Sequence, residues 1–233
     1  MAERVKTTPI VALDVPTMKD ALALVDQLGD RCGFYKVGSE LFTGAGPSIV
    51  AELRARQRDV FLDLKFHDIP NTVAGGVRAA AAMGARLVTV HATGGRAMLE
   101  AAVSAAGSSC GILAVSVLTS ATGAEIAAAW GRRDDVDVAT EVLRLAETAA
   151  KAGVHGIVCS GLEAGLVRER FGDALAVLVP GVRAAGAAKQ DQARVVTPKE
   201  ASLAGARYIV VGRMVTAAPD REAAMASVAD QLA

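Results

Sequence analysis

The sequence predicts a single α/β domain in which eight parallel strands close into a (β/α)8 barrel, also called a TIM barrel. Eight short apolar segments alternate with amphipathic segments, and no change in composition marks a linker between them. The length of 233 residues suits one barrel, so residues 1–233 are expected to form one domain. A doubly wound open sheet is the alternative, because hydrophobic periodicity does not separate the two folds.

The expected strands are apolar runs bounded by glycine, proline or polar residues. They cover residues 9–15, 34–38, 60–64, 87–91, 111–118, 156–160, 175–182 and 208–211. The segments between them predict helices over residues 20–28, 47–56, 72–83, up to 106, 138–153, up to 171, a short one from 197, and 220–232. The polar residues that precede 138 are expected to form a connection.

Several helix starts carry recognisable signals. Thr17 can cap the helix over residues 20–28, and Pro47 suits a first helical position. Thr197 and Glu200, with Pro198 between them, predict a capping box, in which each side chain bonds the other residue's backbone N–H.

Composition excludes several classes of protein. Hydrophobic residues make up 52% of the chain, which predicts a large core, and the zero net charge gives no support to a nucleic-acid or membrane partner. No apolar run is long enough to span a bilayer, and the N-terminus lacks the apolar core of a signal peptide. The cysteines are scattered and odd in number, which predicts core thiols in a reducing, cytoplasmic compartment: Cys32, Cys110 and Cys159.

Charged residues interrupt the apolar third strand. Asp63 and Lys65 leave the same face of that strand, since side chains alternate, and Asp68 follows three residues later. Carboxylates beside an ammonium keep it charged, which would make Lys65 a positioned proton donor. A structural cluster of ion pairs at the strand end is the alternative interpretation.

Polar residues also gather where the other strands end. They are Asp14, Lys36, Asp63, Lys65, His91, Thr119, Arg183 and Arg213. In a barrel these ends meet at one mouth, where enzymes of this fold place their sites. The last two strands end in glycine–arginine sequences, Gly181 to Arg183 and Gly212–Arg213, which predict a phosphate site.

The histidines show no paired metal-binding motif. His67 lies inside the charged segment, with its direction unassigned. His91 is expected to orient a lysine or carboxylate of the site, and His155 is expected to be structural.

Together these motifs resemble the bacterial orotidine 5′-phosphate decarboxylases, a family of the ribulose-phosphate binding barrels. The matching blocks are residues 12–14, 36–38, 63–72, 90–92, 118–120, 180–183, 191–192, 194–198 and 211–213. The resemblance implies conversion of orotidine 5′-monophosphate to UMP and CO2 by a homodimer, without metal or cofactor.

The resemblance also implies roles for individual residues. Asp14 and Lys36 would contact the ribose, and Asp63 and Lys65 would face the reacting carbon, with Asp63, Lys65, Asp68 and Lys36 as the catalytic set. Asp68 and Thr72 would reach the neighbouring subunit's site. Thr119 or Ser120 would contact the base, although residues 121–123 depart from the family pattern and leave Thr122 as a further candidate. The phosphate would be held by Arg183, Gln192, Gly212 and Arg213.

The implied chemistry needs a stabilised carbanion. Loss of CO2 leaves negative charge on C6, which Lys65 can stabilise and then protonate. Residues 184–193 could close over the bound phosphate as a lid.

Two alternatives of different kinds remain. Magnesium-dependent sugar-phosphate lyases of the same superfamily share the Asp-x-Lys-x-x-Asp spacing, but they typically carry an acidic metal ligand where this chain has Lys36. A non-catalytic barrel that binds a nucleotide is the other, since fold alone does not establish function.

Overall fold

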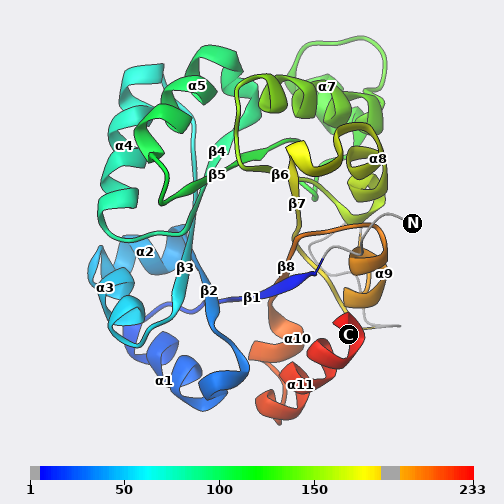
Figure 1. Cartoon of the computed structure of the whole chain (residues 1–233). Helices are drawn as coiled ribbons and strands as arrows, with labels where there is room; N and C mark the ends of the chain where they lie inside the picture. Colours follow the sequence, from blue (N-terminus) through cyan, green and yellow to red (C-terminus); the bar gives the residue numbers. More distant parts are fainter. Residues whose placement is uncertain (1–5, 185–194) are drawn as a thin grey trace.

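The computed structural model describes residues 6–184 and 195–233, and it shows a closed barrel of eight parallel strands. Each strand pairs with the next in the chain, and the last pairs with the first, so the open-sheet alternative is excluded. Figure 1 looks along the barrel, with the strands in a ring and helices around it. The strands are β1 (Thr8–Ala12), β2 (Phe34–Gly38), β3 (Asp59–Phe66), β4 (Leu87–His91), β5 (Gly111–Val115), β6 (Gly156–Val158), β7 (Ala176–Val179) and β8 (Tyr208–Val211).

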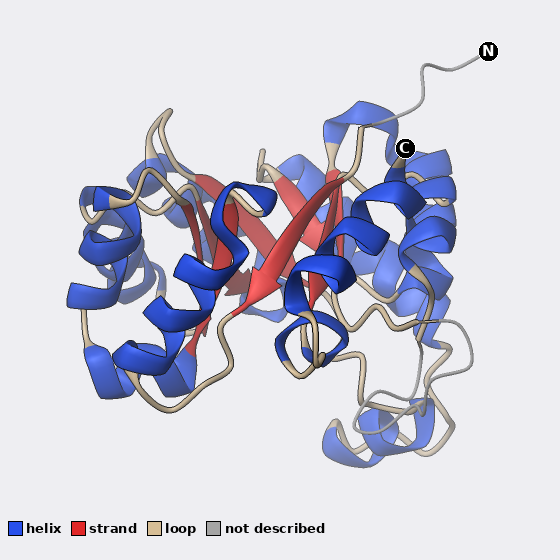
Figure 2. Cartoon of the chain, turned by 90° about the horizontal axis from the view of Figure 1, so that it is seen from below, coloured by secondary structure: helices blue, strands red, loops and turns tan. Residues whose placement is uncertain are grey.

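Helices surround the barrel on its outer side, as the view in Figure 2 also shows. They are α1 (Met18–Leu28), α2 (Ser39–Ala45), α3 (Ser48–Ala55), α4 (Pro70–Ala82), α5 (Gly95–Ala106), α6 (Gly123–Ala129), α7 (Val138–Lys151), α8 (Gly161–Phe171), α9 (Pro198–Leu203), α10 (Arg213–Thr216) and α11 (Arg221–Leu232). Short 3-10 turns follow α1, β4 and α8: η1 (Gly29–Arg31), η2 (Ala92–Gly94) and η3 (Gly172–Ala174). None of the described helices is long and apolar enough to cross a membrane.

The capping signals read from the sequence are confirmed. Thr17 accepts a hydrogen bond from the Asp20 backbone N–H at the start of α1. Thr197 and Glu200 form the expected capping box at α9. These side chains satisfy backbone N–H groups that have no partner inside a helix.

Three helices were not expected: α2, α6 and α10. Helix α6 lies in the polar stretch before residue 138, and a capping box between Thr122 and Glu125 starts it. Helix α10 is a single turn directly after β8. Several strands are also shorter than predicted, because apolar residues after them, such as Val117 and Val182, are buried without continuing the ladder.

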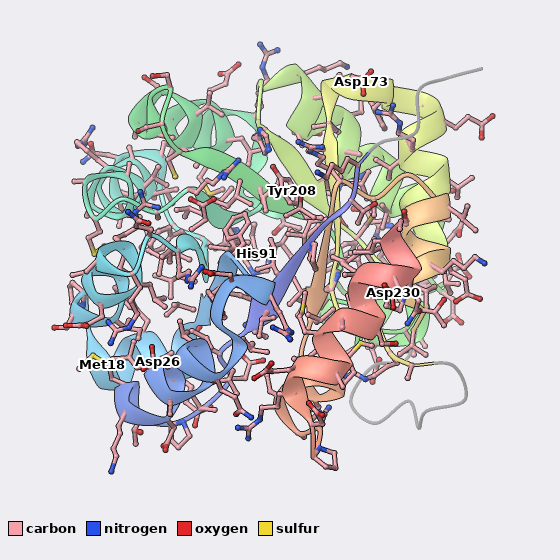
Figure 3. All side chains as sticks on the ribbon, turned by 60° about the horizontal axis from the view of Figure 1, so that its bottom comes forward. Met18, Asp26, His91, Asp173, Tyr208 and Asp230 are labelled. Carbon is pink, nitrogen blue, oxygen red and sulfur yellow. The ribbon has the colours of Figure 1, made fainter. Side chains whose placement is uncertain are left out.

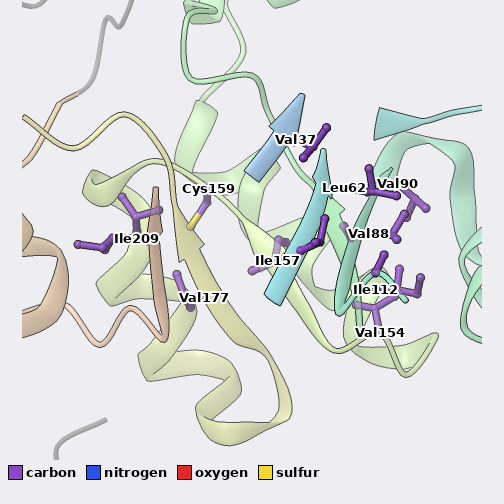
Figure 4. Packing of buried hydrophobic residues seen from close by; sticks show 14 of the residues in the cluster. Val37, Leu62, Val88, Val90, Ile112, Val154, Ile157, Cys159, Val177 and Ile209 are labelled. Carbon is purple, nitrogen blue, oxygen red and sulfur yellow. The ribbon is translucent and has the colours of Figure 1, made fainter. Parts of the chain in front are cut away.

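The core has two layers, separated by the wall of the barrel. Alternate strand residues point inward and fill the barrel: Ile10, Ala12, Phe34, Phe61, Leu87, Leu113, Val115, Val158, Leu178, Tyr208 and Val210. The residues between them point outward and pack under the helices, and Figure 4 shows part of this layer around Leu62, Val88 and Ile157. Successive strand residues therefore alternate between the inside of the barrel and the layer under the helices, and both faces of the sheet are buried.

Aromatic side chains meet at the end of the barrel where the strands begin. The rings of Phe34 and Tyr208 meet edge to face, and His155 Nε2 lies 3.2 Å from the Tyr208 hydroxyl. This contact gives His155 the structural role that was predicted. In Figure 3, His91 and Tyr208 lie toward the middle of the molecule, whereas Asp26, Asp173 and Asp230 lie on surrounding helices and turns.

All of the cysteines are buried free thiols: Cys32, Cys110 and Cys159. Burial raises the pKa of the Cys110 thiol to about 11. A thiol with a raised pKa is a poor nucleophile, which fits the expected role of this residue in the core.

Candidate active site

A cavity of about 540 Å³ opens where the strands end, and most of the predicted site residues line it. Those residues are Asp14, Lys36, Asp63, Lys65, Thr119, Ser120, Arg183, Gly212 and Arg213. Inward residues of the barrel such as Phe61 and Val158 form its apolar walls. The cavity therefore combines an apolar interior with charged groups from strands far apart in the sequence, as a small-molecule site requires.

Four charged side chains form one connected row in this cavity. Lys36 Nζ lies 2.8 Å from Asp14 Oδ1 and 3.7 Å from Asp63 Oδ2. The other oxygen of that carboxylate, Asp63 Oδ1, lies 2.7 Å from Lys65 Nζ. Acids and ammonium groups thus alternate, and Asp63 bridges the two lysines.

Two of these charged side chains are largely buried, so each needs an opposite charge beside it. The Lys36 side chain is 11% exposed and that of Asp63 is 15% exposed. Charges so far from solvent are tolerated when they are paired and hydrogen-bonded. A β-carbon on Gly38 would lie only 3.1 Å from Lys36 Nζ, so the glycine that ends β2 leaves room for the ammonium.

Lys65 has an unusual backbone. Its φ of 51° lies in the left-handed region, which residues with a β-carbon seldom adopt. The β3–β4 pairing shifts register between Leu62 and Phe66, so the strand is irregular at the two charged residues. Strained backbone of this kind often occurs at functional sites.

Thr89 is a site residue that the sequence reasoning missed. Its hydroxyl accepts a hydrogen bond from the Lys65 backbone N–H at 2.9 Å and donates one to Asp63 Oδ1 at 3.1 Å. The available signal was a hydroxyl residue inside an apolar strand, in phase with His91. Thr89 thereby occupies the orienting position expected of His91.

His91 has different surroundings from those predicted. In the described part of the chain it makes no hydrogen bond to Lys65 or Asp63, and its ring lies 5.4 Å from that of His67, centroid to centroid. Burial lowers the pKa of His91, and the nearby His67 and Lys65 lower it further. The imidazole is therefore neutral at neutral pH.

Asp68 and Thr72 do not line the cavity of their own chain. Both are exposed, and Asp68 Oδ1 accepts a hydrogen bond of 2.6 Å from the Ile69 backbone N–H. Within one chain, the carboxylate paired with Lys65 is that of Asp63. The role of Asp68 and Thr72 in a neighbouring subunit stays a prediction.

The last two strands bring two arginines to the cavity. Arg183 follows β7 and Arg213 begins α10, while Gly181 has a φ of 69° that favours glycine. The Arg183 backbone N–H bonds the Val196 carbonyl oxygen at 3.0 Å, which joins the chain on the two sides of residues 185–194. Gln192 and nearly all of the expected lid lie outside the described residues.

The described residues contain no group of three or more histidine, cysteine, aspartate or glutamate side chains placed to hold a metal ion. At the end of β2, the ammonium of Lys36 lies between two carboxylates.

Comparison with known proteins decides the family. The model of the orotidine 5′-phosphate decarboxylase / HUMPS family matches residues 7–228. The chain belongs to this family. The predicted resemblance is confirmed, and with it the prediction that the chain is an enzyme of the decarboxylase family.

Similar proteins extend over nearly the full chain. An orotidine 5′-phosphate decarboxylase of Halorhodospira halophila is 52% identical over 230 residues, covering 96% of this chain and 95% of that protein. One of Pseudomonas syringae pv. syringae is 45% identical over 232 residues and covers 98% of both chains.

Solved structures support the same assignment. The orotidine 5′-phosphate decarboxylase of Lactobacillus acidophilus has a TM-score of 0.86 at 37% identity, covering 97% of this chain and 98% of that one. The enzyme of Pyrococcus horikoshii has a TM-score of 0.78 at 26% identity, covering 97% and 99%. The barrel fold predicted from the sequence is thus shared with members of the family.

Proposed function

We propose that the protein decarboxylates orotidine 5′-monophosphate to UMP and CO2, the final step of pyrimidine nucleotide synthesis, without a metal or other cofactor. The observation that carries this proposal is the Lys65–Asp63 ion pair of 2.7 Å, set in a cavity that also holds Arg183 and Arg213. An ammonium for the reacting carbon and two guanidinium groups for a phosphate are the groups that this substrate needs.

Binding uses the two sides of the cavity differently. The arginines bind phosphate oxygens, because guanidinium groups donate paired hydrogen bonds to such anions. The exposed carboxylate of Asp14 and the ammonium of Lys36 bind the ribose hydroxyls. Thr119 or Ser120 contacts the pyrimidine, with Thr122 as a further candidate, and Gln192 adds a contact to the phosphate.

The reaction begins with the substrate carboxylate beside Asp63. When the bond between C6 and the carboxylate breaks, CO2 leaves and the electron pair stays on C6. The Lys65 ammonium stabilises this developing charge and then transfers a proton to C6, which yields UMP and a neutral amine. The amine regains a proton from solvent before the next cycle. Since the ammonium is positioned in advance, little reorganisation is needed during the reaction.

A homodimer completes the proposed site. Asp68 and Thr72 lie at the exposed start of α4, beside Ile69, whose side chain is 68% exposed. A large exposed apolar residue beside exposed polar side chains suits an interface with a second copy of the chain. In that assembly the partner's copies of the two polar residues contact the substrate, and Asp68 adds a second carboxylate near Lys65.

The magnesium-dependent lyase is disfavoured by the same geometry. A cation held between the Asp14 and Asp63 carboxylates takes the place where such enzymes carry an acidic ligand, and it repels a metal ion. We also propose a cytoplasmic location, which the three buried free thiols support.

The test is the ultraviolet absorbance of orotidine 5′-monophosphate incubated with the purified protein in excess EDTA. Loss of the orotate absorbance with release of CO2 is expected. A folded protein that leaves the substrate unchanged would overturn the proposal. Activity on a sugar phosphate that appears only with added magnesium would favour the lyase, and ligand binding without turnover would favour the non-catalytic barrel.

A further inference from the structure

We propose that Thr89 is the positioning residue that fixes Lys65 and Asp63 relative to each other. The inference rests on the proposed function for its effect on rate, whereas its structural part stands on geometry alone. Thr89 lies in the middle of β4, and no atom of it lines the substrate cavity. It therefore acts through its neighbours and is not itself catalytic.

One hydroxyl group joins the two charged residues. Thr89 Oγ1 accepts a hydrogen bond of 2.9 Å from the Lys65 backbone N–H and donates one of 3.1 Å to Asp63 Oδ1. The same Asp63 oxygen accepts the 2.7 Å hydrogen bond from Lys65 Nζ. A closed ring results, in which Thr89 holds the backbone of the lysine and the carboxylate that holds its ammonium.

The irregular register of β3 explains why a side chain is needed there. Leu62 pairs with Val88 and Phe66 pairs with Val90, so Asp63, Leu64 and Lys65 all lie opposite the single residue Thr89. In such a bulge the extra residues lose their regular ladder bonds. The threonine hydroxyl supplies the missing acceptor for Lys65, at the residue with a left-handed φ of 51°.

Burial means that water does not replace this hydroxyl. Thr89 is 1% exposed, and its β-branched side chain has few rotamers available in a strand. A hydroxyl is also the smallest group that donates and accepts at one atom, as this position requires. Valine has nearly the same shape but neither donates nor accepts a hydrogen bond. A valine substitution therefore removes the hydrogen bonds while it keeps the packing.

The experiment compares Thr89→Val with Thr89→Ser. Thr7→Val is the matched control, because Thr7 is also a buried threonine whose hydroxyl bonds backbone, here the Ala206 carbonyl oxygen at 2.7 Å, and it lies at the opposite end of the barrel. The Thr89→Val variant is expected to lose about 100-fold in kcat, as a displaced catalytic group does. Its KM is expected to change little, since the phosphate and ribose groups are intact. Thr89→Ser should recover most of the rate, and Thr7→Val should keep it.

Amide hydrogen exchange gives a readout that does not depend on activity. The Lys65 N–H should be protected in the wild type, Thr89→Ser and Thr7→Val, and should exchange faster in Thr89→Val. Equal protection in all four proteins would overturn the inference even if the wild type showed no decarboxylation. Conversely, an active wild type with an equally active Thr89→Val variant would overturn it while leaving the proposed function intact.

Discussion

Lys36 and Asp14 form a 2.8 Å ion pair between an enclosed ammonium and an open carboxylate. The Lys36 side chain is 11% exposed and that of Asp14 is 63% exposed. The lysine is therefore fixed from within by the barrel, while the carboxylate that meets it remains accessible to a ligand. This asymmetry leads to a prediction about Asp14.

Asp14→Ala should weaken substrate binding far more than it destabilises the fold. An ion pair with one largely exposed partner contributes less than about 1 kcal/mol to stability. The KM for orotidine 5′-monophosphate should rise because a ribose contact is lost. The matched control is Asp26→Ala, since Asp26 is 64% exposed and pairs with Arg56 at 3.3 Å on the outer surface. Chemical denaturation and steady-state kinetics on both variants check this, and equal KM values for the two would contradict it.

Lys65→Ala should fold and bind UMP but lose nearly all turnover. The alanine removes both the cation that stabilises charge at C6 and the proton donor, whereas Arg183 and Arg213 remain. Single-turnover assays and UMP titration measure the two effects separately. Lys151→Ala is the control, because Lys151 pairs with Glu147 on exposed helix surface. A Lys65→Ala enzyme with the wild-type rate would remove this residue as the proton donor.

Arg213→Ala should reduce the affinity for UMP far more than the affinity for uridine. Hydrogen bonds to charged groups contribute about 1.5–3 kcal/mol, which corresponds to a loss of roughly 10- to 150-fold in affinity. Calorimetric titration with both ligands measures the difference. Arg96→Ala, which removes an exposed arginine paired with Glu100 on α5, is the control. If the substitution at Arg213 weakened both ligands equally, this arginine would not be a phosphate ligand.

Stability should fall as the solution is acidified through the ordinary pKa of histidine. Because burial lowers the pKa of His91 below 6.5, the unfolded chain binds a proton at a higher pH than the folded chain. The free energy of unfolding therefore rises with pH in that window. The contribution of His91 to stability is fully present above about pH 6.5 and is lost as the pH falls toward the pKa of His91 in the folded protein. Denaturation of the wild type and of His91→Gln over this range measures the contribution. A steeper decline of stability with acidification in the variant than in the wild type would contradict this prediction. An NMR titration that gave His91 a pKa above the ordinary histidine value would contradict it as well.

Much of the fold and site could be predicted because both depend on repeated local signals. Each strand is a short apolar run. Asp14 and Arg213 follow such runs and Lys36 interrupts one, so the closed barrel brings them to one cavity. Thr89 could not be predicted in this way. Its contacts arise from a bulge, which shifts the register of β3 against β4 and leaves no periodic trace in the sequence.

Other features of the fold and the site depend on interactions that hydrophobic patterns in the sequence do not encode. Helix α6 was missed because it is short and polar, although its capping box was visible at Thr122 and Glu125. His91 was expected to bond the charged row, but its ring instead lies beside His67. The roles predicted for Asp68 and Thr72 involve a second chain, which no pattern within one chain can specify.

The side chains that fill the barrel beneath the cavity determine the route of every molecule that enters. Phe34, Leu87 and Tyr208 pack below the apolar walls of the cavity, and all three are buried. Substrate therefore arrives, and both products depart, by the same opening at the strand ends. CO2 is small and uncharged and can leave while UMP is still bound, whereas the next substrate must wait for the nucleotide to go. UMP in excess should consequently act as a competitive inhibitor of its own formation.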